Sequence, residues 1–164
     1  MDNHAPRNLK SQNSKIDNSE EARKADALSL PEVRRGMREA WERSEADAPE
    51  KRHEEGGYIG LCPDGSLQVV PWPQGERGLI EMPERNADGK YKGIFVISSY
   101  HTHPNPTIDE EGRRWEQSPS EIDIEMIIRE KYSGDSFVIS NAIVYRVKPD
   151  GRVEEVGERE KTLS

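Results

Sequence analysis

Apolar side chains are concentrated in one part of the chain. Residues 1–28 contain almost no large apolar side chain, whereas residues 91–147 hold the densest apolar runs. A core can form only where apolar residues cluster, and a length of 164 residues suits one domain. We therefore expect one domain over residues 29–157, preceded by a disordered or loosely packed arm at 1–28 and followed by a polar tail at 158–164.

The first periodic segment of the chain is helical. Its apolar residues recur at i, i+4, i+7 and i+8, which places them on one face of a helix. Ser29 precedes this pattern, Pro31 fits the first turn, and Glu32 lies three residues after Ser29, so we expect a capping box with Ser29 as the N-cap. The apolar positions of this face are Val33, Met37, Ala40 and Trp41.

The middle of the chain shows strand patterns. Residues 54–61 are typical of a strand entered through glycines, and turn residues lead from it into a second hairpin strand at 67–70. Residues 71–90 are rich in Pro, Gly and charge, which indicates a long surface loop. Residues 91–103 form the strongest strand pattern, and their apolar side chains on both faces indicate a central strand.

A polar loop at 104–117 separates this strand from a second helix. Ser118 is the expected N-cap of that helix, with Pro119 at N1 and Glu121 at N3, and the helix should run to about Lys131. The remaining apolar runs predict three more strands, at 137–139, 142–147 and 153–156. This order of elements predicts an α/β sandwich with a mixed sheet.

Composition and charge exclude several classes of function. The net charge is −8, and Lys and Arg are interspersed with Asp and Glu, so the chain lacks the basic face that a nucleic-acid binder needs. Cys62 is the only cysteine, which rules out an intrachain disulfide. Cysteine-protease chemistry is excluded as well, because Cys62 precedes a Pro-Asp-Gly turn and has no clear partner. No apolar run approaches the ~20 residues of a membrane span. The N-terminus also lacks the apolar stretch of a signal peptide, so we expect a cytoplasmic protein, or one exported without such a signal.

His101 and His103 end the central strand and are the first candidate site residues. Side chains at i and i+2 of a strand point to the same side, so both imidazoles can reach one metal ion. Pro104 then turns the chain away from the sheet. An H-x-H pair by itself is equally compatible with two ordinary polar residues at a strand end.

Asp123 strengthens the interpretation as a metal site. It lies early in the second helix, beside Met126 and Ile127, which should face the core. A carboxylate at the edge of a buried stripe is costly unless it is paired or binds a metal. The alternative is that Asp123 only complements the positive end of the helix dipole, which leaves the histidine pair unexplained.

Two further residues complete the candidate site. A zinc site with two histidines and one carboxylate leaves a position open for water, and a nearby carboxylate is needed to take the proton of that water. Glu54 and Glu55 both compete for this role, and spacing alone does not choose between them. Ser120 is either a simple helix N-terminal residue or, because Ser118 already suits the cap, free to hydrogen-bond a carbonyl oxygen beside the metal.

These residues resemble the signature of the JAB/MPN (JAMM) zinc metallopeptidases. His101-Thr102-His103-Pro104, followed by Pro119-Ser120-Glu121-Ile122-Asp123-Ile124, is similar to H-x-H-P and P-S-x-x-D-[IL]. Glu54-Glu55-Gly56-Gly57 resembles the E-x-G-G form of a bacterial branch that contains uncharacterised and toxin-associated proteins. The resemblance covers about residues 30–157.

The resemblance implies a fold, a cofactor and an activity. The fold would be JAB/MPN-like (cytidine-deaminase-like), with a mixed sheet flanked by helices. The implied ligands of one Zn²⁺ per chain are His101, His103 and Asp123. Glu54, rather than Glu55, would hold the attacking water and shuttle its proton, and Ser120 would help to stabilise the oxyanion. The reaction would be hydrolysis of a peptide or isopeptide bond, often at the tail of a ubiquitin-like protein.

Two departures from the family pattern bear on the substrate. Residues 104–119 insert a polar loop between the second histidine and Ser120, and we expect this loop to overhang the cleft as a specificity lid or as a block. The N-terminal helix and arm are not required by the core of the family. Trp72, Trp115 and the loop at 71–90 are candidate substrate contacts, although a lone aromatic residue in a loop is more often a simple anchor of that loop.

Other classes of function account for the motifs less well. Amidohydrolase and PHP-type barrels also begin with H-x-H, but they need about 200 or more residues. The serious rival is a JAMM-like module that binds a protein partner without catalysis, such as a component of an effector or toxin system. Scaffolds of that kind usually lack one or more ligands, whereas this chain keeps the full set, so we favour the enzyme.

Overall fold

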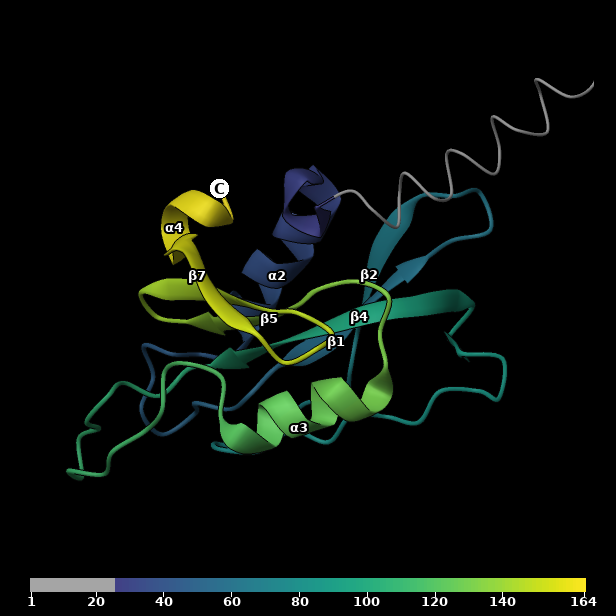
Figure 1. Cartoon of the computed structure of the whole chain (residues 1–164). Coiled ribbons are helices and arrows are strands. Elements are labelled where there is room, and N and C mark those ends of the chain that lie inside the picture. The colour runs from purple at the N-terminus through teal and green to yellow at the C-terminus, as the bar shows by residue number, and fades with distance from the viewer. Residues whose placement is uncertain (1–25) are drawn as a thin grey trace, which may run out of the picture.

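The structure is a computed structural model that describes residues 26–164. It has a mixed α/β architecture, in which helices lie on both faces of one seven-stranded sheet (Figure 1). This confirms the expected α/β class with a mixed sheet. The expected arm at 1–28 lies almost wholly outside the described residues. Within the described range, no helix combines the length and the apolar character that crossing a bilayer requires.

The sheet is built around its longest strand, β4 (Ile94–His103). The strand order is β2-β1-β4-β5-β6-β7, and β3 pairs with β4 beside this path. β4 and β5 are parallel, whereas the other paired strands run antiparallel. The other strands are β1 (Gly56–Leu61), β2 (Leu67–Pro71), β3 (Lys90–Tyr91), β5 (Ser136–Ser140), β6 (Ile143–Val147) and β7 (Val153–Glu158). The prediction of a central strand that ends in the two histidines is therefore confirmed.

The helices divide between the two faces of the sheet. The helix α2 (Pro31–Arg43), preceded by the short 3₁₀ helix η1 (Ala27–Ser29), lies on the same side as α4 (Arg159–Thr162), and α3 (Glu121–Glu130) lies on the opposite side (Figure 1). Each face buries its own apolar cluster. Because α3 connects the parallel strands β4 and β5, its N-terminus follows the loop that leaves the C-terminal end of β4.

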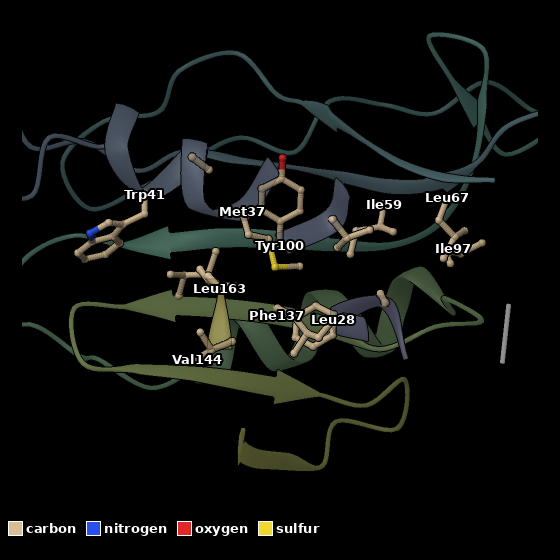
Figure 2. Close-up of a cluster of buried hydrophobic side chains, with 14 residues drawn as sticks. Leu28, Met37, Trp41, Ile59, Leu67, Ile97, Tyr100, Phe137, Val144 and Leu163 are labelled. Carbon is tan, nitrogen blue, oxygen red and sulfur yellow. The ribbon is translucent and has the colours of Figure 1, made fainter. Parts of the chain in front are cut away.

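The larger core lies between the sheet and α2. Met37 from α2 packs in one cluster with Tyr100 from β4 and Phe137 from β5, and Figure 2 shows these side chains together with Leu163. Leu163 is only 2% exposed, so the segment expected as a polar tail, 158–164, contributes one side chain to this core. Leu28 is also buried, so the packed domain extends past both ends of the predicted range 29–157.

Two local predictions were wrong for reasons that the structure shows. Ser29 does not cap α2, because it belongs to η1 and its hydroxyl donates to the carbonyl of Asp26 at 2.7 Å. The N-cap of α2 is Leu30, which makes no side-chain capping bond. The strand predicted over 91–103 is divided, because Lys92 and Gly93 both adopt positive φ and turn the chain between β3 and β4.

Candidate metal centre

The end of β4 brings two imidazoles together. His101 and His103 lie on the same side of the strand, as predicted, and their Nε2 atoms are 3.2 Å apart. Nδ1 of His103 lies 3.2 Å from the carbonyl oxygen of Gln117, so this nitrogen carries the proton and donates it. In a neutral imidazole with this tautomer, Nε2 of His103 is the nitrogen that can bind a metal.

The first turn of α3 places a carboxylate against both imidazoles. Oδ1 of Asp123 lies 3.3 Å from Nε2 of His101, and Oδ2 lies 3.3 Å from Nε2 of His103. Burial opposes ionisation of Asp123, but the neighbouring histidines outweigh burial and hold the pKa of the carboxyl well below its ordinary value. The carboxylate therefore carries the negative charge that a cation site needs.

Ser120, and not Ser118, is the N-cap of α3. Its backbone amide donates to Oδ2 of Asp123 at 2.9 Å, and its Oγ accepts from the backbone amide of Asp123 at 3.1 Å. The prediction of Ser118 as the cap is wrong because Asp123, rather than Glu121, occupies the N3 position that closes the capping box. Ser120 thus fixes the carboxylate, and its hydroxyl proton stays available for another acceptor.

The spacings between the candidate ligand atoms resemble those around a tetrahedral ion. Zn–N and Zn–O distances of about 2.05 Å place neighbouring tetrahedral ligands ~3.3 Å apart. The two Nε2 atoms are 3.2 Å apart, and each lies 3.3 Å from a different oxygen of Asp123, Oδ1 for His101 and Oδ2 for His103, so each pair is close to that spacing. The donor set, two imidazoles and one carboxylate, is the set that leaves a fourth position open in hydrolytic zinc sites.

Glu54 reaches the same site from the neighbouring strand. It precedes β1, whose first residue Gly56 is the register partner of His101. The backbone of Glu54 is fixed by hydrogen bonds to Gly75 and Glu76, at 2.9 and 2.7 Å. Its side chain is 7% exposed. One ligand atom from each of Glu54, His101 and His103 lies within 4.8 Å of the others, and this group can hold a metal ion.

The pKa of Glu54 separates it from the other carboxylate. Burial raises this pKa from 4.5 to about 7, against a lowering effect of His103 and with a further increase from Asp123. A carboxyl that titrates near neutral pH can both accept and return a proton. Asp123 stays ionised, so the two acids of this site are suited to different tasks.

Glu55 is engaged elsewhere, which resolves the choice that spacing left open. Its Oε1 accepts from Nε2 of His53 at 2.9 Å and lies 4.0 Å from Nε of Arg43. Its backbone amide donates to the hydroxyl of Thr102 at 3.0 Å. Glu55 therefore holds the segment before β1 against its neighbours, while Glu54 faces the imidazoles.

The inserted loop 104–119 is ordered around one buried acid, Asp109. Oδ2 of Asp109 accepts from the indole of Trp115 at 2.9 Å and from Arg77 at 3.1 Å. Oδ1 accepts from the backbone amides of Glu111 and Arg113, each at 2.9 Å. The loop is thereby fixed to the segment that follows β2 and forms a wall of the site. The Asp-x-x-Gly spacing of Asp109 and Gly112 is the signal in the sequence that indicates such a turn.

A cavity of about 350 Å³ connects these residues. Glu54, His101, His103, Ser120 and Asp123 all line it, so the structure brings together every residue predicted for the site. Both candidate contact residues, Trp72 and Trp115, line it as well. Sequence analysis placed the 71–90 and 104–119 loops at the site without singling out their wall residues Arg77, Ile80, Met82 and Asn105. It missed Tyr132, which follows α3 and belongs to no motif.

Comparison of the chain with protein-family models, with curated proteins and with solved structures gives no match in any of the three.

Proposed function

We propose that this protein is a zinc hydrolase of the JAB/MPN type that cleaves a peptide or isopeptide bond. The observation that supports the proposal most directly is the convergence of four side chains from three separate elements, the end of β4, the first turn of α3 and the segment before β1. The motifs that resemble the family supply the same four residues. The mixed sheet flanked by helices is compatible with that fold.

The proposed ligands are His101, His103 and Asp123. Glu54 and Asp123 both lie near the histidine pair, and we assign the ligand role to Asp123 because its oxygens are 3.3 Å from both Nε2 atoms. A zinc ion bound there would supply a Lewis acid, which lowers the pKa of water and polarises a carbonyl.

Glu54 is the proposed general base and acid. In the metal-free chain burial raises its pKa to about 7, and its position beside the imidazoles suits a group that takes a proton from water and returns it to the leaving amine. The position of Ser120 at the rim of the same cavity suits a hydroxyl that donates to the oxyanion, since Oγ already accepts from the Asp123 amide and its proton is free to donate. Burial of Glu54 excludes bulk water from this proton transfer.

The test separates metal binding from chemistry. The full chain is loaded with zinc, its metal content is measured by atomic absorption, and cleavage of a peptide library is followed by mass spectrometry. Glu54→Gln should keep one zinc per chain and lose turnover by at least ~100-fold, whereas Asp123→Asn should lose zinc. Glu50→Gln, the same substitution at an exposed acid close by, serves as the control.

Two results would overturn the proposal. One is peptide cleavage by Glu54→Gln at the rate of the unchanged chain. The other is loss of zinc from Glu54→Gln with retention by Asp123→Asn, which would make Glu54 the ligand. Zinc binding without cleavage of any peptide or isopeptide substrate would favour the non-catalytic interaction module instead.

A further inference from the structure

The cavity of the candidate metal centre extends into an apolar end. Its walls there come from the segment between β2 and β3, from α3 and from the turn after α3. The apolar side chains of this end pack against one another in the smaller core cluster and are Trp72, Ile80, Met82, Ile127 and Tyr132. The same cavity is therefore lined by the candidate catalytic residues at one end and by these apolar side chains at the other.

The rim of this cavity is apolar on two sides. Leu79, from the segment after β2, is 60% exposed, and Ile122, from the first turn of α3, is 67% exposed. They are the two most exposed large hydrophobic side chains among residues 26–164. Exposed apolar side chains at the mouth of a cavity mark a binding surface for an apolar partner rather than for a sugar or a nucleotide.

Two charged side chains of the wall, those of Arg77 and Glu130, are already paired. Nε of Arg77 donates to Oδ1 of Asn105, and its Nη2 donates to Asp109, both at 3.1 Å. The carboxylate of Glu130 accepts from Arg85 at 2.7 Å. A charged substrate side chain would therefore gain little at the apolar end, whereas an apolar one would remove its own surface and that of the wall from water.

We propose that this apolar end is a substrate pocket for a bulky apolar side chain, of the size of Leu, Met or Phe, in the residue next to the bond that is cleaved. The proposal rests on the proposed hydrolase function, because it places the scissile bond at the metal centre. It adds the substrate class, since the apolar side chains at this end would pack against such a side chain and a glycine would leave them uncovered. The whole cavity, metal centre included, has a volume of about 350 Å³, which leaves room for a side chain of this size.

Binding is measured without turnover, so that catalysis does not limit the test. The zinc-loaded full chain with Glu54→Gln is titrated with fluorescein-labelled hexapeptides that differ only at one central residue, which is Leu, Phe, Gly or Asp. Fluorescence anisotropy should show the Leu and Phe peptides binding about 10-fold or more tightly than the Gly peptide. The Asp peptide should bind no better than the Gly peptide.

A pair of variants locates the preference. Met126 lines the cavity, so Met126→Trp in the same background should fill it and reduce the advantage of Leu over Gly to less than about 3-fold. Ile128→Trp is the matched control on the same helix, because Ile128 is 46% exposed and is not part of the cavity wall. It should keep the full preference. Retained zinc content shows that each variant is folded at the site.

Equal binding of all four peptides, tighter binding of the Gly or Asp peptide, or no binding of any peptide would overturn the pocket. A preference for Leu and Phe that Met126→Trp does not reduce would also overturn its location. Failure of the hydrolase proposal has a different signature. The Leu peptides would then bind the zinc-loaded unchanged chain without being cleaved. In that case the apolar pocket stands as a binding site and the chemistry does not.

Discussion

The backbone amides of Ser120 and Asp123 each donate to the side chain of the other residue, at 2.9 and 3.1 Å. This reciprocal pair begins α3 and at the same time aims the Asp123 carboxylate at the two imidazoles. The local signal that starts a helix and the geometry of the candidate metal ligand therefore depend on the same two hydrogen bonds.

Removal of the Ser120 hydroxyl should affect stability and metal affinity together. Ser120→Ala removes the cap and should lower the free energy of unfolding by about 1 kcal/mol, measured by urea denaturation of the metal-free chain. The Ser120 backbone amide still donates to Oδ2 of Asp123 in this variant, but loss of the cap loosens the first turn of α3 that holds Asp123, so zinc binding should weaken by about 10-fold in a chelator competition. Ser120→Thr keeps the capping oxygen and should stay close to the unchanged chain in both measurements. Unchanged zinc affinity in Ser120→Ala would contradict the orienting role.

Because the pKa of Glu54 is raised, its ionised carboxylate should destabilise the folded state of the metal-free chain. Its pKa is about 7 in the folded state against an ordinary value of 4.5, so ionisation penalises the folded state increasingly as the pH rises from about 4.5 to 7. In the presence of EDTA, Glu54→Gln should therefore be more stable than the unchanged chain at pH 8, by up to about 3 kcal/mol. The difference should vanish below pH 4.5. Equal stability at pH 8 would show that Glu54 is not buried as the structure has it.

Asp109 should control the order of the inserted loop without binding the metal. Asp109→Ala removes the acceptor shared by Trp115, Arg77 and two backbone amides. We expect faster hydrogen exchange at the amides of Glu111 and Arg113 and faster trypsin cleavage after Arg113, with zinc content retained. Glu111→Ala changes an exposed acid in the same loop and should leave both rates unchanged. Equal protection in Asp109→Ala would contradict the role of this buried acid.

Gly56 is required by close packing beside the site. A Cβ at this position would lie 2.7 Å from the Trp72 ring and 2.8 Å from the carbonyl oxygen of Tyr100. Gly56→Ala should therefore destabilise the chain by about 1–3 kcal/mol and displace Glu54, which lies two residues earlier. Gly134→Ala is the control, because its Cβ would meet its nearest neighbours at an ordinary 3.5 Å. Thermal unfolding of both variants checks the difference, and equal midpoints would count against the close approach.

The sequence predicted the local features and missed those that depend on packing across the chain. The H-x-H pair could be placed at a strand end because strand periodicity is local. Burial of Leu163 could not be predicted from a polar segment, since it depends on the space that α2 and the sheet leave open. The cap was assigned to Ser118 because Glu121 offered an equally good capping box, and only the position of Asp123 in three dimensions decides for Ser120.

The apolar end of the cavity illustrates the same limit. Met82 and Tyr132 lie far apart in the sequence, yet the Tyr132 hydroxyl donates to the Met82 sulfur at 3.1 Å. Neither residue belongs to a motif, and each looks like a loop or helix-end residue when it is considered alone. The motif residues of the metal centre could be found in the sequence because metal binding and proton transfer restrict the residue type. A position in a pocket wall restricts only the size and polarity of its side chain.

The loop 104–119 begins directly after His103 and ends directly before Ser120, so it is closed at its base by residues that hold the centre. A metal ion bound by His103 and Asp123 would hold the two ends of the insertion close together. Doubling the length of such a loop costs only about 0.6 kcal/mol of closure entropy. Insertions or deletions at its tip could therefore reshape what the protein recognises while the coordinating atoms stay where they are.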